Sequence, residues 1–283
     1  MNVISIPMLA ALLLLLANCG AQAAGIKSKA ATPTVKKKVS TQPEDPFLLL
    51  QKAAARGDTE AQYNLGWKYS NGDGVLKDAA KSFEWFQKAA AQGHAGAQFI
   101  LGVMYAKGDG TPKNAAKTIE WFQKAASQGH AEAQFFLGVM HTYGEGVPKD
   151  VSKAMEWYQK AAVQGHAEAQ YNLGWMYSNG EGARKDIAKT VEWFQKAAAQ
   201  QHAEAQYNLG VMYRDGEGVT KDVAKATEWL QKAADQQHAD AQYNLGLMYR
   251  DGEGVTKDST KAIEWFQKAA SQGHKKAQFI LNM

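Results

Sequence analysis

The strongest constraint on this chain is an internal repeat with a period of 36 residues. A tryptophan and a glutamine recur at this interval along most of the sequence. They are Trp85, Trp121, Trp157, Trp193, Trp229 and Trp265, and Gln62, Gln98, Gln134, Gln170, Gln206, Gln242 and Gln278. A fixed period of this kind is typical of a stacked solenoid, in which one unit buries its apolar face only against its neighbours. We therefore expect the function to lie on a surface that several units share.

Each unit contains the signals of two helices. In the first unit, apolar residues at helical spacing predict a helix over roughly residues 59 to 71, called helix A below. Gly72 predicts its end, because glycine tolerates the positive φ of a helix C-terminal cap. Asp78 can cap a second helix over roughly residues 78 to 92, called helix B. Small residues such as Gly66 predict a close approach of the two helices.

The repeated pattern is specific enough to suggest a family. A-x-A-Q-x-x-L-G-x-M-Y-x-x-G-x-G-V, followed by K-D-x-x-K-A-x-E-W-x-Q-K-A-A, resembles the Sel1-like repeat, a relative of the tetratricopeptide repeat. The resemblance covers nearly all of residues 59 to 283. It implies an all-α, right-handed superhelical solenoid of stacked helix-turn-helix repeats. For function it implies protein or peptide binding without naming a partner, since one fold hosts many functions.

The chain divides into five segments. They are a secretory signal peptide (1–23), a flexible basic linker (24–46), an N-terminal capping helix (47–58), six repeats (59–274) and a C-terminal partial repeat helix (275–283). The capping helix is in register with the second half of helix B, and the final segment is in register with helix A. Such atypical terminal units are expected to close a solenoid.

The N-terminal segment predicts export. The apolar run over residues 8–17 is too short to span a bilayer as an ordinary transmembrane helix. Ala21 and Ala23 provide the small residues expected before a cleavage site, so the mature chain would begin at Ala24. Lipidation of Cys19 is an alternative, although Asn18 departs from the lipoprotein pattern, and an uncleaved anchor is a third. Either cleavage predicts a periplasmic or secreted protein of bacterial style, touching the membrane only through the signal or a lipid anchor.

Composition and motifs favour binding over catalysis. The formal net charge of +4 is too small to predict a nucleic-acid partner. The sequence contains no phosphate-cradle, serine-hydrolase or zinc-protease motif. We therefore predict a non-enzymatic adaptor without a cofactor. The alternatives are a hydrolase acting on cell-wall or β-lactam material, as suggested for some cysteine-rich Sel1-like relatives, whose repeated cysteines this chain lacks, and a purely structural spacer.

Two kinds of repeated side chain are expected to be structural. Six histidines share one repeat position: His94, His130, His166, His202, His238 and His274. Neighbouring helices in a stack lie roughly 10 Å apart, whereas metal ligands lie about 2 Å from their ion, so we predict a structural role in the loop and no metal site. The helix B tryptophans are expected in the core, with a cost of about 3–5 kcal/mol for Trp157→Ala. Trp67 and Trp175 replace aliphatic residues of helix A and are expected to be partly exposed.

Helix A is expected to provide the binding surface. By resemblance to tetratricopeptide arrays it lines the concave groove, and helical spacing places residues 60, 64, 67 and 71 on one face of the helix. Repeated asparagines on this face would hydrogen-bond to the backbone of an extended peptide, unless they are relics of duplication. An exposed apolar patch around Ile100 and Phe136 would dock a partner side chain, and arginines would mark the far end. The candidate residues are Tyr63, Asn64, Trp67, Ile100, Val103, Phe136, Val139, Tyr143, Asn172, Trp175, Asn208, Arg214, Asn244 and Arg250.

Overall fold

A computed structural model describes residues 45–282 of the chain, and all regular structure in this range is helical. The helices A are α3 (Thr59–Asn71), α5 (Ala95–Lys107), α7 (Ala131–Tyr143), α9 (Ala167–Asn179), α11 (Ala203–Asp215), α13 (Ala239–Asp251) and the shorter α15 (Lys275–Leu281). The helices B are α2 (Pro46–Ala55), α4 (Ala79–Ala91), α6 (Ala115–Ser127), α8 (Val151–Val163), α10 (Ile187–Ala199), α12 (Val223–Asp235) and α14 (Ser259–Ser271). The predicted all-α solenoid is confirmed. The signal segment, Cys19 and nearly all of the linker lie outside the described residues.

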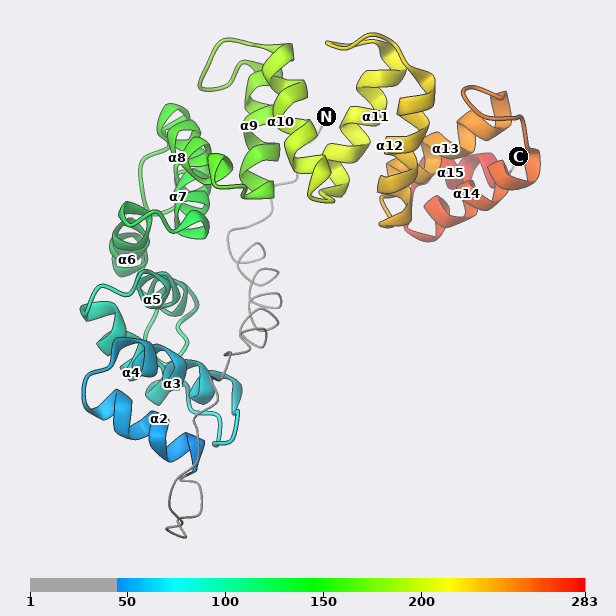
Figure 1. Cartoon of the computed structure of the whole chain (residues 1–283). Coiled ribbons are helices and arrows are strands. Elements are labelled where there is room, and N and C mark those ends of the chain that lie inside the picture. The colour runs from blue at the N-terminus through cyan, green and yellow to red at the C-terminus, as the bar shows by residue number, and fades with distance from the viewer. Residues whose placement is uncertain (1–44, 283) are drawn as a thin grey trace, which may run out of the picture. The chain divides into compact units, whose positions relative to one another are not determined.

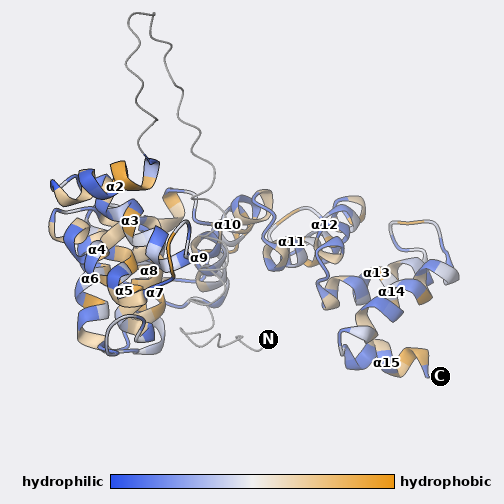
Figure 2. Cartoon of the chain, turned by 90° about the horizontal axis from the view of Figure 1, so that it is seen from below, coloured by the Kyte–Doolittle hydropathy of each residue, from blue (hydrophilic) through white to orange (hydrophobic). Residues whose placement is uncertain are grey.

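The helices form two compact units. Within the described residues, the first unit comprises 45–140 and 145–147, and the second comprises 141–144 and 148–282. In each unit helices that follow one another in sequence pack together, as Figure 1 shows for α3 beside α4 and for α11 beside α12. Hydrophilic and hydrophobic residues are interleaved along these helices in Figure 2, as expected for amphipathic helices that each bury one side.

The predicted helix ends are confirmed. Gly72 adopts the left-handed conformation at the end of α3, with φ 83°, and its N–H donates to the Lys68 carbonyl. Asp78 caps α4, because its side chain accepts a hydrogen bond from the Lys81 backbone N–H. Each later helix B begins with an Asp or Asn in the same role: Asn114, Asp150, Asp186, Asp222 and Asp258.

The core of each repeat forms where a glycine of helix A meets a large side chain of helix B. A Cβ atom at Gly66 would lie 2.8 Å from the ring of Phe86, so only glycine permits this approach. Phe86 is buried, as are its equivalents Phe122, Tyr158, Phe194, Leu230 and Phe266. The core residue of helix B is therefore the one that follows the repeated tryptophan.

The prediction that the helix B tryptophans are core residues is wrong for most of them. Trp193 is buried, but Trp85, Trp121, Trp157, Trp229 and Trp265 are only half-buried. Each lies one position, or about 100° around the helix, before the buried core residue. The lysine three residues later covers the exposed ring face, and Lys88 Nζ lies 4.0 Å from the ring centroid of Trp85.

This position lowers the expected cost of removing a tryptophan. Because Trp85 is half-buried at the edge of the cluster formed by Ala54, Ala61 and Leu65, we expect Trp85→Ala to cost about 2 kcal/mol of unfolding free energy. Phe86→Ala should cost about 4 kcal/mol, because Phe86 is fully buried. Urea denaturation of both variants measures the difference. Equal losses would show that the tryptophan is a core residue after all.

Candidate partner-binding surface

The apolar centre of the predicted surface is buried. Ile100, Val103 and Val139 are nearly inaccessible, and Phe136 is 0% exposed. The ring of Phe136 stacks on Phe122 at 5.7 Å and on Phe99 at 6.0 Å between centroids. The prediction of an exposed apolar patch is therefore wrong. The physical reason is that α5 and α7 carry apolar residues around most of their circumference, and for Phe136 the rings of Phe99 on α5 and Phe122 on α6 cover the side chain.

The first helix A of the first unit, α3, keeps part of the predicted surface accessible. Tyr63 and Trp67 are half-buried in an aromatic cluster, where Tyr63 stacks on His94 at 4.2 Å and Trp67 meets Phe86 edge-on at 5.5 Å. Asn64 is exposed, and its Nδ2 donates to Glu60 Oε1 at 3.5 Å. Tyr143, which ends α7 and belongs to the second unit, is also exposed. The partial exposure predicted for Trp67 and Trp175 is confirmed.

The second unit combines accessible polar and apolar side chains on adjacent helices A. Asn172 and Trp175 of α9, and Asn208 and Val211 of α11, are all half-exposed. These four residues are called the stripe below. His202, which caps α11, has its Nε2 3.1 Å from Glu168 Oε2 of α9, so the two helices lie side by side. Burial raises the pKa of the Tyr171 hydroxyl, which keeps this tyrosine protonated.

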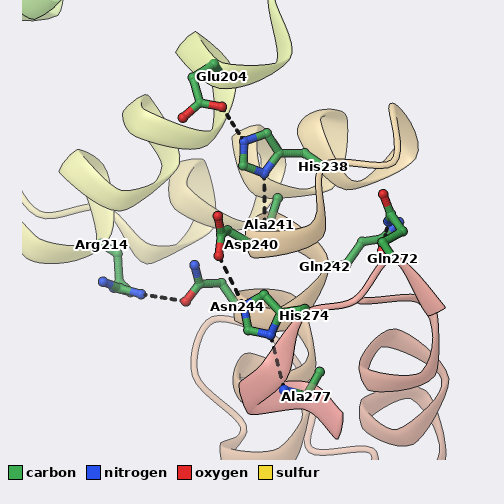
Figure 3. A network of polar contacts seen from close by, with 10 residues as sticks. All are labelled: Glu204, Arg214, His238, Asp240, Ala241, Gln242, Asn244, Gln272, His274 and Ala277. Carbon is green, nitrogen blue, oxygen red and sulfur yellow. Dashed lines mark hydrogen bonds and ion pairs between the residues drawn. The ribbon is translucent and has the colours of Figure 1, made fainter. Parts of the chain in front are cut away.

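Four of the repeated histidines join successive helices A, namely His94, His202, His238 and His274. His238 Nδ1 accepts a hydrogen bond from the Ala241 N–H at 3.3 Å and thereby caps α13. Because Nδ1 is an acceptor, the neutral ring carries its proton on Nε2, which lies 2.7 Å from Glu204 Oε2 on α11. Figure 3 shows this contact and its counterpart between Asp240 and His274. The predicted structural role of these histidines is confirmed.

The histidine contact predicts acid sensitivity. The hydrogen bond with His238 lowers the pKa of Glu204. A carboxyl group whose pKa is lowered by folding stabilises the protein above its unfolded pKa of about 4.3, and that contribution is lost as the pH falls through the lower folded value. Glu204→Gln should therefore lower the thermal midpoint near pH 6 and have little effect near pH 3. A difference from wild type that is the same at both pH values would contradict this explanation, and Glu228→Gln serves as an exposed control.

The predicted ladder of asparagines is interrupted at α13. Asn244 is only 9% exposed, and its Oδ1 accepts a hydrogen bond from Arg214 Nη1 at 3.2 Å (Figure 3). Asn244 is therefore nearly inaccessible and its Oδ1 is engaged within the protein, which contradicts the expectation of an open amide at this position. Sequence analysis placed both residues but missed their contact, although the arginine replaces a serine of the preceding unit.

The arginines do not form a free cationic end. Asp215 accepts from Arg214 Nε at 2.8 Å and from Nη2 at 3.1 Å. Arg250, which is exposed, forms the same bidentate pair with Asp251 at 2.8 Å for both contacts. These contacts lower the pKa of both aspartates, so the pairs stay ionised. The predicted attraction for a partner carboxylate is largely offset.

Other kinds of site find little support in the described part of the chain. Residues 45–282 contain no group of three or more His, Cys, Asp or Glu side chains that could hold a metal ion. A shallow hollow of about 380 Å³ lies at α14 and α15 and is lined mainly by apolar side chains, among them Ile263, Phe266 and Ile280. None of the helices described is long and apolar enough to cross a membrane.

Comparison with known proteins reveals related sequences and structures. The family model for the Sel1 repeat matches residues 47–58, 59–94, 95–130, 131–166, 167–202, 203–238 and 239–274. The crystal structure of a protective antigen of uropathogenic Escherichia coli with an SLR fold is 38% identical, with a TM-score of 0.79 over 82% of this chain. This chain spans only 50% of that antigen. A Sel1 repeat protein from Oxalobacter formigenes is 35% identical, with a TM-score of 0.71 over 80% of this chain and 93% of its own. No curated protein matches the sequence.

Proposed function

This chain belongs to the Sel1 repeat family, whose members are generally non-enzymatic scaffolds for protein partners, and we propose that it binds an extended peptide segment of a partner on the stripe. One observation carries the proposal. On α9 and α11, side-chain amides and apolar side chains lie next to each other and remain half-exposed, whereas the corresponding residues of α5 and α7 are buried.

The chemistry of the stripe suits a peptide in extended conformation. The amides of Asn172 and Asn208 each donate and accept hydrogen bonds, which matches the alternating N–H and C=O groups of a peptide backbone. Trp175 and Val211 add apolar contact area for side chains, and tryptophan is frequent among the residues that dominate binding energy. In this role the protein is an adaptor, and it carries out no chemistry on its partner.

The proposal is tested with a library of random peptides of about a dozen residues. Peptides that bind the full chain are selected, and their affinities are measured by calorimetry. We expect Trp175→Ala to weaken binding of the selected peptides at least roughly tenfold. Glu228→Gln, on the exposed side of α12, should leave the affinity unchanged. Failure to enrich any peptide, or equal binding by both variants, would overturn the proposal.

We further propose that the protein is exported from a bacterial cell. The support is the short apolar run over residues 8–17 and the small residues at Ala21 and Ala23. Mass spectrometry of the mature protein should show a chain that begins at Ala24, whereas a lipid anchor would leave Cys19 as the first residue. An intact N-terminus on the purified protein would contradict export by cleavage.

A further inference from the structure

One position near the end of helix A differs between the repeats of the second unit. The side chain at this position decides whether the asparagine on the next helix A is covered or accessible. The position is occupied by Ser178 in α9, Arg214 in α11 and Arg250 in α13. The asparagine position of the following helix is Asn208, Asn244 and Ile280, respectively. Only Arg214 therefore combines a long hydrogen-bond donor with an asparagine partner.

Arg214 is held in place on both sides. Asp215 binds Nε and Nη2, which leaves Nη1 directed at Asn244 Oδ1 at 3.2 Å. Asn244 is nearly inaccessible, and its Oδ1 is engaged by the guanidinium. A peptide could use this amide only by displacing a guanidinium that is paired with a carboxylate.

The preceding repeat shows the open arrangement. Ser178 Oγ donates to the Trp175 carbonyl at 2.8 Å, so this side chain turns back to its own helix. Asn208 is partly exposed, whereas Asn244 at the equivalent position of the next repeat is nearly inaccessible. The two asparagines thus occupy the same repeat position and differ in whether an arginine covers them.

We infer that Arg214 is a specificity-determining residue that ends the peptide-binding surface at α11 by occupying Asn244. The inference rests on the proposed function and adds the length of the bound segment: a peptide that spans α9 and α11 and gains nothing from residues placed over α13. Because Asp215 neutralises Arg214, the closed end does not select an acidic residue in the peptide.

The test exchanges the two arrangements. Arg214→Ser should open the Asn244 position, and Ser178→Arg combined with Asn179→Asp should cover Asn208 in the same way that Arg214 and Asp215 cover Asn244. The probes are peptides selected on the wild-type chain, each also synthesised with two or three added alanines at either end. Arg250→Ser is the matched control, because Arg250 faces no asparagine.

We expect the added residues at one end to improve affinity for Arg214→Ser by roughly tenfold and to leave wild type and Arg250→Ser unchanged. The Ser178→Arg, Asn179→Asp variant should bind the original peptides at least tenfold more weakly than wild type, with unchanged thermal unfolding. If peptide extension has the same effect on wild type and Arg214→Ser while Trp175→Ala still weakens binding, this inference fails and the proposed function stands. If Trp175→Ala has no effect either, both fail.

Discussion

The Phe136→Asp variant is expected to unfold the first unit and not to act through a lost partner contact. Phe136 is 0% exposed and stacks on Phe99 and Phe122. Truncating such a ring to alanine costs about 3–5 kcal/mol. Aspartate adds the cost of burying a carboxylate without a partner, so its effect should exceed that of alanine. Total domain stability is commonly about 5–15 kcal/mol, and the variant should therefore lose most of the native first unit.

Circular dichroism and urea denaturation of Phe136→Ala and Phe136→Asp measure this effect. Asn64→Asp is a suitable control, because it introduces the same side chain at an exposed position of the same unit and should change stability by less than about 0.5 kcal/mol. A folded Phe136→Asp protein with native stability and reduced peptide affinity would restore the interpretation of Phe136 as part of an exposed patch.

Removing one glutamine of the repeated row should also cause a large loss of stability. Gln206 is buried, its Nε2 donates to the Ala198 carbonyl at 3.1 Å, and its Oε1 accepts from Gln236 Nε2 at 2.8 Å. Figure 3 shows Gln242 and Gln272, which make the same inter-repeat contact at 2.7 Å. Gln206→Met keeps the volume but removes both hydrogen bonds. The Ala198 carbonyl still accepts from the Gln201 N–H at 3.0 Å and Gln236 is exposed, so each lost bond should cost about 0.5–1.5 kcal/mol.

We therefore expect Gln206→Met to lower the unfolding free energy by about 1–3 kcal/mol in urea denaturation. Gln231→Met removes an exposed hydrogen bond with Asp235 and should cost less than about 0.5 kcal/mol. If the two variants are equally stable, the buried glutamine contacts do not hold the repeats together.

The repeat pattern was enough to predict the fold. The 36-residue period corresponds to the spacing of successive helices A, as in α3 and α5, which begin at Thr59 and Ala95. Gly72 and Asp78 are local signals, and each marks a helix end in the structure. The glutamine row served only to mark the period in the sequence. Its role could not be predicted, because each contact joins side chains 30 positions apart, as in Gln206 and Gln236.

The binding surface was harder to predict because burial depends on neighbouring helices. Helical spacing correctly placed Phe136 and Asn172 on equivalent faces, but it cannot tell whether another helix covers that face. The structure buries Phe136 and leaves Asn172 half-exposed. In the same way, the sequence shows that Arg214 replaces a serine, but only the structure shows that its guanidinium reaches Asn244.

Photo-crosslinking tests the central claim most directly, namely that a peptide partner binds the helix A side of the second unit. Benzoylphenylalanine is introduced at Val211 on the stripe or at Glu228 on the exposed side of α12 in the same repeat, and each protein is irradiated with a selected peptide. We predict a crosslink from position 211 and none from position 228. A crosslink from position 228 alone would place the partner on helix B and contradict the account.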